Sequence, residues 1–187
     1  MQKVNLIYFK DHKCLHGNFG DELSKFITEN LINKDKYDLV YNEHNISLNI
    51  VCIGFYIHKA VDHCHIYGSG VRTLENLEQG HLYETLNVHA LRGPLSKKFL
   101  KEEKNIAVDD NIVYGDPALL LPRFYQPNIQ PNLRDKIGLV PHKSNYEKYV
   151  DIMDDSSVFF LIKPTDPWEK VIDSIASCKS VVSSSLH

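Results

Sequence analysis

The segment CHIYGSG (residues 64–70) is a short apolar run that ends in a glycine-rich turn. The run IVCIG (50–54) has the same form, and VHAL (88–91) is followed at once by the tripeptide RGP (92–94). Short apolar runs of this kind are typical of buried parallel strands, whose carboxyl ends lead into turns that face ligands. The three runs therefore predict a parallel sheet in the first half of the chain.

Helical patterns separate these predicted strands. The first follows a strand over 4–9, and its apolar residues lie three or four apart, at Leu23, Phe26, Ile27 and Leu31. In the second, Pro94 is placed to open a helix that runs to Glu102. Strands that alternate with helices predict an α/β fold with parallel sheets.

A second cycle of strands and helices follows a proline-rich stretch. Pro122, Pro127 and Pro131 lie among Asn and Gln residues, a composition typical of a linker. Beyond it we expect strands over 136–140, 157–162 and 180–183, with helices over 146–153 and from Pro167. The sequence thus predicts two Rossmann-like units, of which the second is incomplete. They are an N-terminal domain over 1–124, a linker over 125–133 and a partial C-terminal domain over 134–187.

Length and composition exclude several classes of protein. The 187 residues are 43% hydrophobic and 24% charged, as in an ordinary folded protein. A net charge of −3 is too balanced to neutralise a nucleic-acid backbone, so we expect no nucleic-acid partner. No apolar run approaches the roughly 18 residues that a membrane span needs, and the chain opens without a signal-peptide pattern. We therefore expect a cytoplasmic protein.

Cysteines and histidines offer little support for a metal site. The four cysteines form no C-x-x-C pair, the spacing of zinc and redox motifs. His63 and His65 would converge on a metal if both lay on one face of a strand. No second pair of ligands stands at a usual zinc spacing, so we expect neither a metal nor a resident cofactor.

Five segments lie where ligands bind in open α/β sheets, at the carboxyl ends of strands and beside helix N-termini. None of them is a G-x-G-x-x-G or Walker A loop, so no motif supports a nicotinamide or a nucleoside triphosphate. Taken singly, GSG (68–70) and GDP (115–117) are both explained as tight turns. The five segments are 17–22, 68–70, 92–94, 115–117 and 183–187.

Taken together and in order, these segments resemble the polysaccharide pyruvyl transferase family, over essentially the whole chain. The motifs that carry the resemblance are GNFGDELS (17–24), IYGSG (66–70), LRGPLS (91–96), GDPALLLP (115–122), IGLVPH (137–142) and SSSLH (183–187). The resemblance implies a GT-B-like architecture that is truncated in its second domain. It also implies a transferase of exopolysaccharide biosynthesis, which uses phosphoenolpyruvate to place a pyruvate ketal on a sugar of a surface polysaccharide.

The resemblance implies a set of site residues as well. Arg92 would anchor the donor, because a guanidinium binds both carboxylate and phosphate; the alternative is that it caps a carbonyl or pairs with an aspartate. His187 matches the histidine of the family's Ser-x-Leu-His motif and would transfer protons near neutral pH. Asn18 and Asp21 would bind the acceptor or shape the cleft, or else cap a helix. The substrate-binding residues that we expect are Asn18, Gly20, Asp21, Gly68, Ser69, Gly70, Asp116, His142, Ser184 and Ser185.

Two features depart from the family's pattern. Ser185 stands where some members carry an arginine, and the chain ends at His187, where the family continues with a glycine and a helix. Two other hypotheses therefore stay open, a GT-B-like glycosyltransferase that uses a nucleotide sugar and an inactive truncated relative. The expected partners are phosphoenolpyruvate and a saccharide acceptor, with at most peripheral membrane contact through a lipid-linked acceptor.

Overall fold

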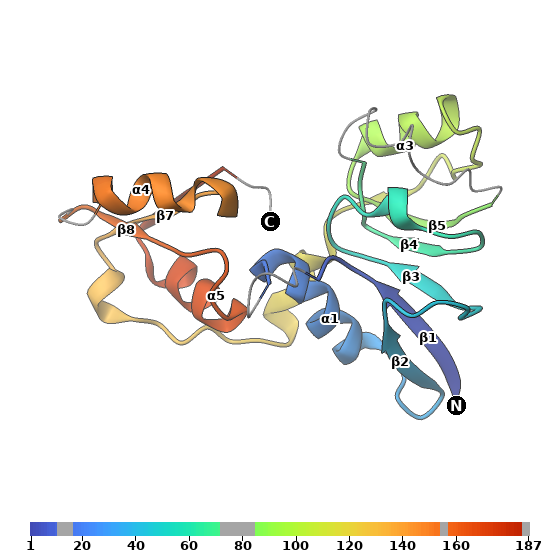
Figure 1. Cartoon of the computed structure of the whole chain (residues 1–187), viewed down its shortest axis with the longest axis horizontal. Helices are drawn as coiled ribbons and strands as arrows, with labels where there is room; N and C mark the ends of the chain where they lie inside the picture. The colour runs from blue at the N-terminus through green and yellow to red at the C-terminus, as the bar shows by residue number, and fades with distance from the viewer. Residues whose placement is uncertain (11–16, 72–84, 154–156, 185–187) are drawn as a thin grey trace. The chain divides into compact units, whose positions relative to one another are not determined.

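The computed structural model describes residues 1–10, 17–71, 85–153 and 157–184 (Figure 1). Contacts divide the chain into two compact units, each built on its own parallel sheet. Unit 1 comprises Met1–Phe9 and Leu23–Phe124, and unit 2 comprises Lys10–Glu22 and Tyr125–His187. The fold is therefore α/β with Rossmann-like units, the second of them small, as the alternation of strands and helices predicts.

Six parallel strands form the sheet of unit 1, in the order β2-β1-β3-β4-β5-β6. The chain moves from β1 to β2 on one side and returns to β3 on the other, so the strand order reverses at β1. The short strand β2, with the sequence YDLVY, is absent from the sequence prediction. The bounds are β1 (Gln2–Ile7), β2 (Tyr37–Tyr41), β3 (Asn49–Val51), β4 (His65–Tyr67), β5 (Asn87–Leu91) and β6 (Val113–Tyr114).

Helical segments cover the two faces of this sheet. The crossover from β1 to β2 runs in the opposite direction to those from β3 onward, so right-handed crossovers place their helices on opposite faces. On one face, Phe99 and Leu100 pack with Ile66 and Leu91 in the main core. The helical segments are α1 (Phe19–Leu31), η1 (Ile57–Lys59), α3 (Pro94–Glu102) and η2 (Pro117–Arg123), of which α1 spans the boundary between the two units in sequence.

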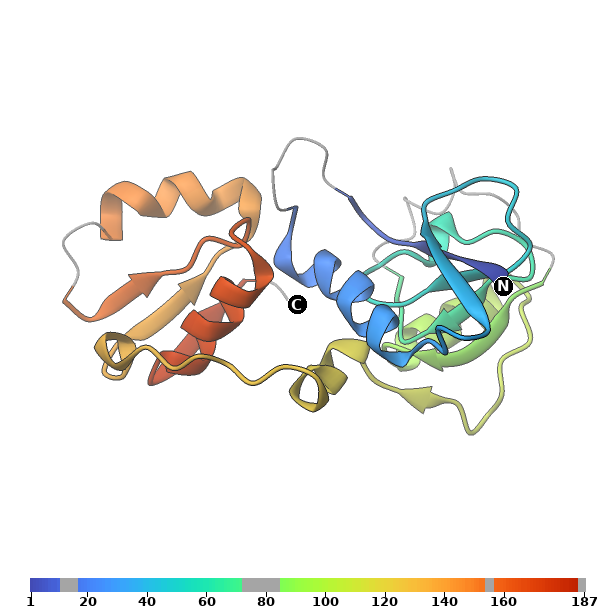
Figure 2. The same cartoon turned by 90° about the horizontal axis from the view of Figure 1, so that it is seen from below.

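Unit 2 has a three-stranded parallel sheet in the order β8-β7-β9. Figures 1 and 2 show α4 and α5 on opposite sides of this sheet. Its core contains Val140, Ile162 and Val171, together with Phe19 from the start of α1. The described residues 17–22 are thus grouped with unit 2 by their contacts, and the domain bounds expected from the sequence stay a prediction. The elements are η3 (Pro131–Leu133), β7 (Ile137–Val140), η4 (Lys143–Asn145), α4 (Tyr146–Met153), β8 (Phe159–Leu161), α5 (Trp168–Ser177) and β9 (Ser180–Ser183).

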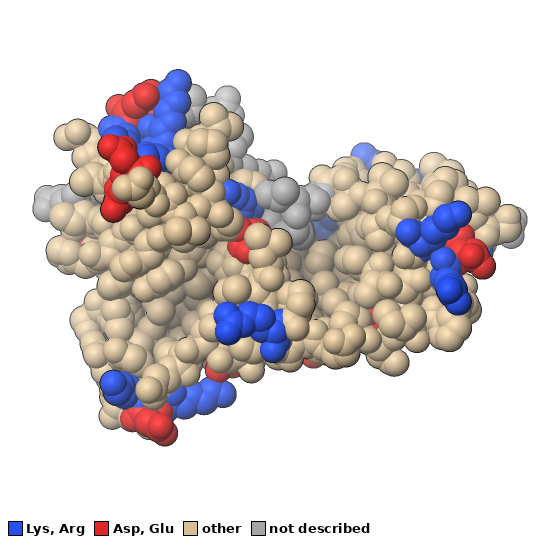
Figure 3. Space-filling view, turned by 180° about the vertical axis from the view of Figure 1, so that it is seen from behind, with Lys and Arg blue, Asp and Glu red and all other residues tan. Residues whose placement is uncertain are grey.

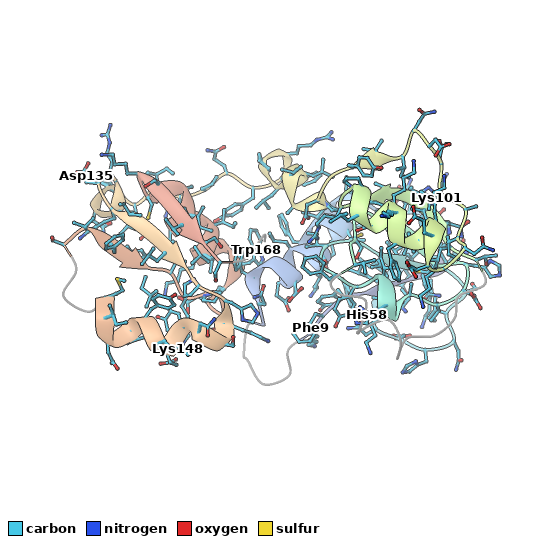
Figure 4. The ribbon with its side chains drawn as sticks, turned by 90° about the horizontal axis from the view of Figure 1, so that it is seen from above. Phe9, His58, Lys101, Asp135, Lys148 and Trp168 are labelled. Carbon is cyan, nitrogen blue, oxygen red and sulfur yellow. The ribbon has the colours of Figure 1, made fainter. Side chains whose placement is uncertain are left out.

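The proline-rich stretch at the start of unit 2 is fastened along α5. The Tyr125 hydroxyl donates to the Asp173 carboxylate at 2.7 Å, and the Asn128 N–H donates to the same oxygen at 2.9 Å. The Tyr125 ring meets the Trp168 ring edge-on, with centroids 4.8 Å apart. Trp168, labelled in Figure 4, is the first residue of α5. Burial and the Asp173 carboxylate raise the pKa of Tyr125 to about 12, so its hydroxyl keeps its proton and donates.

Charged side chains of both signs are mixed on the surface. Figure 3 shows basic and acidic groups side by side on the face in view. On α3, for example, Lys97 and Lys101 each lie 3.1 Å from the Asp110 carboxylate. In the part of the chain that the structure describes, no helix has both the length and the apolar character needed to cross a bilayer.

Candidate functional site

Three of the predicted ligand-facing turns meet at the carboxyl edge of the unit 1 sheet. They follow the adjacent strands β4, β5 and β6 and contain Gly68–Gly70, Arg92 and Asp116. Backbone hydrogen bonds join them: the Arg92 N–H donates to the Ser69 carbonyl at 3.1 Å, and the Gly68 N–H donates to the Ala90 carbonyl at 2.8 Å. We call Gly68, Ser69, Gly70, Arg92 and Asp116 the carboxyl-edge cluster.

Arg92 lies at the centre of this cluster. Its Nη2 atom is 2.8 Å from Asp116 Oδ2, and the two side chains are only 9% and 16% exposed. The guanidinium also lies 4.9 Å from the centre of the Phe55 ring, within the range of a cation–π contact. Pairing with an aspartate is the alternative that the sequence left open for Arg92. Asp116 in turn caps η2, because its carboxylate accepts the Ala118 N–H at 3.0 Å.

Gly68 allows the turn after β4 to pack against the turn after β6. Its φ of +80° lies in the left-handed region that favours glycine. A Cβ atom at this position would lie 2.4 Å from Pro117 Cδ and 2.6 Å from the Gly115 carbonyl oxygen. A side chain at residue 68 would therefore separate the two turns that carry the cluster.

Ser69 holds the turns after β3 and β4 together. It is fully buried, and its hydroxyl donates to the Gly54 carbonyl at 2.9 Å and accepts the Tyr56 N–H at 3.1 Å. The Gly70 N–H donates to the same Gly54 carbonyl at 3.0 Å. Both residues thus shape the cluster, and their direct contact with a substrate stays a prediction.

The buried cysteines of unit 1 are not activated nucleophiles. Burial raises the pKa of the Cys52 thiol to about 11 and that of Cys64 to about 12. Because the thiolate is the reactive form, both groups are inert near neutral pH. Neither thiol is therefore part of the candidate site of the unit.

A second group of predicted residues meets at the carboxyl edge of the unit 2 sheet. His142 follows β7 and Ser184 follows β9, and these strands are neighbours. The His142 N–H donates to Ser184 Oγ at 2.7 Å, and its ring Nδ1 lies 2.8 Å from Ser144 Oγ. Ser185 and His187 lie outside the described residues, so their roles stay predictions.

Asn18 caps α1, which is the alternative that the sequence left open for it. Its Oδ1 atom accepts the Gly20 N–H at 3.0 Å, and its carbonyl accepts the Glu22 N–H at 3.1 Å. Gly20 is buried, and Asp21 lies in the first turn, where negative charge stabilises the helix dipole. Binding of substrate by these three residues stays a prediction.

We expect Asn18→Ala to destabilise unit 2 by about 1 kcal/mol, the usual cost of removing a capping side chain. Asn18→Asp is the matched control, since aspartate also caps and adds favourable charge at the helix start. Urea unfolding followed by the fluorescence of Trp168, the one tryptophan of the chain, measures the difference within unit 2. Equal losses in both variants would show that the capping hydrogen bond is unimportant.

A pocket of about 270 Å³ beside β8 was not predicted from the sequence. Its lining includes Tyr146, Phe160, Lys163, Asp166 and Lys170, none of which is a predicted site residue. Within it, Lys170 pairs with Asp166 at 2.7 Å, and the Lys163 ammonium lies 5.5 Å from the centre of the Tyr146 ring. The signal in the sequence is the run FFLIKP (159–164), in which a lysine follows an apolar strand directly.

His63 and His65 do not converge in the structure. His63 has a φ of 62° and its Nδ1 lies 2.9 Å from Thr85 Oγ1, whereas His65 Nδ1 lies 2.9 Å from His89 Nε2. Among the described residues, no group of three or more His, Cys, Asp and Glu side chains is arranged to hold a metal ion.

Comparison with known proteins gives a family match over most of the chain. The model of the family described as polysaccharide pyruvyl transferase matches residues 18–187. An uncharacterized protein of Acanthamoeba polyphaga mimivirus is 25% identical over 174 residues, which cover 91% of this chain and 58% of that protein. The chain thus spans little more than half the length of this relative. No solved structure matches the chain.

Proposed function

The chain belongs to the polysaccharide pyruvyl transferase family, and on this premise we propose that it transfers pyruvate from phosphoenolpyruvate to a sugar of a surface polysaccharide, as a ketal. The observation that best supports the proposal is the convergence of three family motifs on Arg92 at the carboxyl edge of unit 1. Ligands of open α/β sheets bind at this edge.

The proposed reaction defines what the site must supply. Two hydroxyls of the sugar each form a C–O bond to the central carbon of phosphoenolpyruvate, and the bond from that carbon to the phosphate oxygen breaks. One of the two released protons goes to the methylene carbon, which becomes a methyl group, and the other leaves with the phosphate. The site therefore needs a cation for the anionic donor and a group that transfers protons.

Arg92 is the proposed anchor for the donor. Its guanidinium is held by Asp116 and Phe55, which would fix the orientation in which it meets an anion. Gly93 precedes α3 and Pro94 opens it, and no side chain caps this helix, whose positive N-terminal end would add to the attraction. Proton transfer is assigned to His187, and His142 and Ser184 are proposed to contact the substrate.

We expect phosphoenolpyruvate to raise the melting temperature of the wild-type chain, because a ligand at 100 times its Kd stabilises the native state by about 2.7 kcal/mol. Arg92→Ala should lose this rise, whereas Arg123→Ala, which removes an exposed arginine on η2, should keep it. With oligosaccharide acceptors, the wild type should release phosphate and form a ketal methyl group visible by NMR.

An equal response of both arginine variants to phosphoenolpyruvate would contradict the role of Arg92. A wild-type chain that is stabilised by a nucleoside diphosphate and not by phosphoenolpyruvate would instead support a glycosyltransferase that uses a nucleotide sugar. A chain that responds to neither ligand would support an inactive relative.

A further inference from the structure

Three rings form a continuous row on the surface of β4 and β5 in unit 1, in which Tyr67 stacks on His89 and His65 meets His89 edge to edge. The Tyr67 and His89 rings lie with centroids 4.5 Å apart and planes 10° apart, and His89 and His65 lie 5.1 Å and 5° apart. A hydrogen bond of 2.9 Å joins His65 Nδ1 and His89 Nε2 in the plane of the two imidazoles, which therefore meet at their edges. We call Tyr67, His89 and His65 the ring stack.

A β-bulge brings His89 into the ring stack. Ile66 pairs with Val88, but Tyr67 pairs with Ala90, so β5 carries one extra residue between these two positions. That residue is His89, whose ring meets the rings of the neighbouring strand. Bulges commonly re-aim a side chain next to a functional site.

The ring stack lies on the face of the sheet opposite the main core. His65 pairs with Ile50, and Ile50 packs in the separate cluster of Leu6, Tyr8 and Cys52. Tyr67 on β4 is 40% exposed, and Val113 on β6, on the other side of β5, is 67% exposed. This part of the sheet is therefore open to solvent.

Among the described residues, β4, β5 and β6 present His65, Tyr67, Asn87, His89 and Val113 on this face. None of these five side chains carries a formal charge when the imidazoles are neutral. Burial and the neighbouring His89 ring lower the pKa of His65, which favours the neutral form at pH 7. Nucleic acids and acidic membranes require clustered cations, and none of these five side chains is a lysine or an arginine.

The chemistry of the ring stack suits an uncharged sugar. The C–H groups on one face of a pyranose pack against an aromatic ring, while its hydroxyls hydrogen-bond to a phenol, an imidazole or an amide at the ring edges. Tyr67 directly precedes Gly68, so the strand that carries two of the rings leads straight into the turn that carries part of the carboxyl-edge cluster.

We propose that the ring stack binds the saccharide acceptor, with Tyr67 and His89 as its main contacts. The inference deepens the proposed function and rests on it for the identification of this saccharide as the acceptor. Binding of a saccharide to these rings is a separate property, which can be measured without donor or turnover.

The test is titration of the full chain with neutral trisaccharides of glucose, galactose and mannose, by saturation-transfer NMR and calorimetry. For the trisaccharide that binds, Tyr67→Ala and His89→Ala should each raise the Kd about tenfold or more, as expected when a stacked ring is lost. Tyr114→Ala is the matched control, because Tyr114 is 45% exposed on β6, the neighbour of β5, and lies outside the ring stack. Tyr114→Ala should leave the Kd for the trisaccharide within about twofold of the wild-type value.

Several results would overturn the inference. They are an absence of binding by the wild type, an unchanged Kd in both ring variants, and an equal loss in Tyr114→Ala. A change of oligomeric state in Tyr67→Ala without loss of saccharide binding would identify the surface as a contact between copies of the chain. If Tyr67→Ala does not fold, the proposal is tested by the saccharide Kd of His89→Ala and of Tyr67→Phe, the second of which keeps the aromatic ring.

The two proposals fail in distinguishable ways. If trisaccharide binding depends on Tyr67 but phosphoenolpyruvate releases no phosphate, the result supports a saccharide site at the ring stack. It contradicts the proposed function. If a ketal forms and the KM for the acceptor is the same in Tyr67→Ala as in the wild type, the proposed function is supported. The proposal that the ring stack binds the acceptor is then contradicted.

Discussion

Replacing Gly68 by alanine should destabilise unit 1 by about 3 kcal/mol or more, because two penalties add. The φ of +80° is strained for any residue with a Cβ. The new Cβ would also lie 2.4 Å from Pro117 Cδ and 2.6 Å from the Gly115 carbonyl oxygen, and a proline ring and a backbone carbonyl cannot turn aside as a flexible side chain can. The turns after β4 and β6 must then separate, which would also displace Asp116.

Gly93→Ala is the matched control for this prediction. Gly93 has an extended backbone with a φ of −173°, and no atom lies within 4 Å of the position of a new Cβ. The free energy of unfolding of Gly93→Ala should differ from that of the wild type by less than about 1 kcal/mol. Urea unfolding by far-UV circular dichroism measures both variants, with Trp168 fluorescence as a separate record of unit 2. Similar stabilities of the two variants would show that the contact at Gly68 is readily relieved.

Asp116→Ala should cost unit 1 about 3 kcal/mol, since it removes the carboxylate from a guanidinium that is only 9% exposed. The double variant Arg92→Met and Asp116→Ala should recover at least about 1 kcal/mol of this loss, because no buried charge is then left behind. Asp116→Asn keeps an oxygen that can cap η2, so it separates the loss of charge from the loss of the cap.

An exposed ion pair in the same unit provides the reference. Lys98 and Glu102 lie one turn apart on α3 with side chains 67% and 59% exposed, so Glu102→Gln should cost no more than about 0.5 kcal/mol. The measurement is a double-mutant cycle, which compares the free energies of unfolding of the wild type, Arg92→Met, Asp116→Ala and the double variant. The same cycle on Lys98 and Glu102 gives the coupling energy of the exposed pair. A coupling energy no larger than that of the exposed pair would mean that Arg92 and Asp116 act independently.

Elements with a clear local pattern were predicted well from the sequence. The expected helix over 146–153 and strand over 180–183 have the bounds of α4 and β9. By contrast, α1 begins four residues before Leu23, the first residue of the apolar pattern. Its first turn depends on the Asn18 cap and on Phe19, which packs against Val140, Ile162 and Val171. These partners lie more than a hundred residues away, so no local pattern could reveal them.

Part of the candidate site was likewise predictable from the sequence, and part was not. That the turns after β4, β5 and β6 share one edge followed from the predicted parallel sheet, because parallel strands end at the same side. The sequence could not decide whether Arg92 faces an anion or an aspartate. Arg92 and Asp116 are 24 residues apart in the sequence, and they meet because β5 and β6 are neighbours.

The sequence by itself determined the α/β class, most of the strands and the motifs of the family, because each depends on residue types at short spacing. The tertiary structure determined the Arg92–Asp116 pair, the burial of Ser69 and the ring stack. His65 and His89 are also 24 residues apart, and their rings meet through the register of two strands and one bulge. Register and bulges arise from the packing of whole strands, which no single segment encodes.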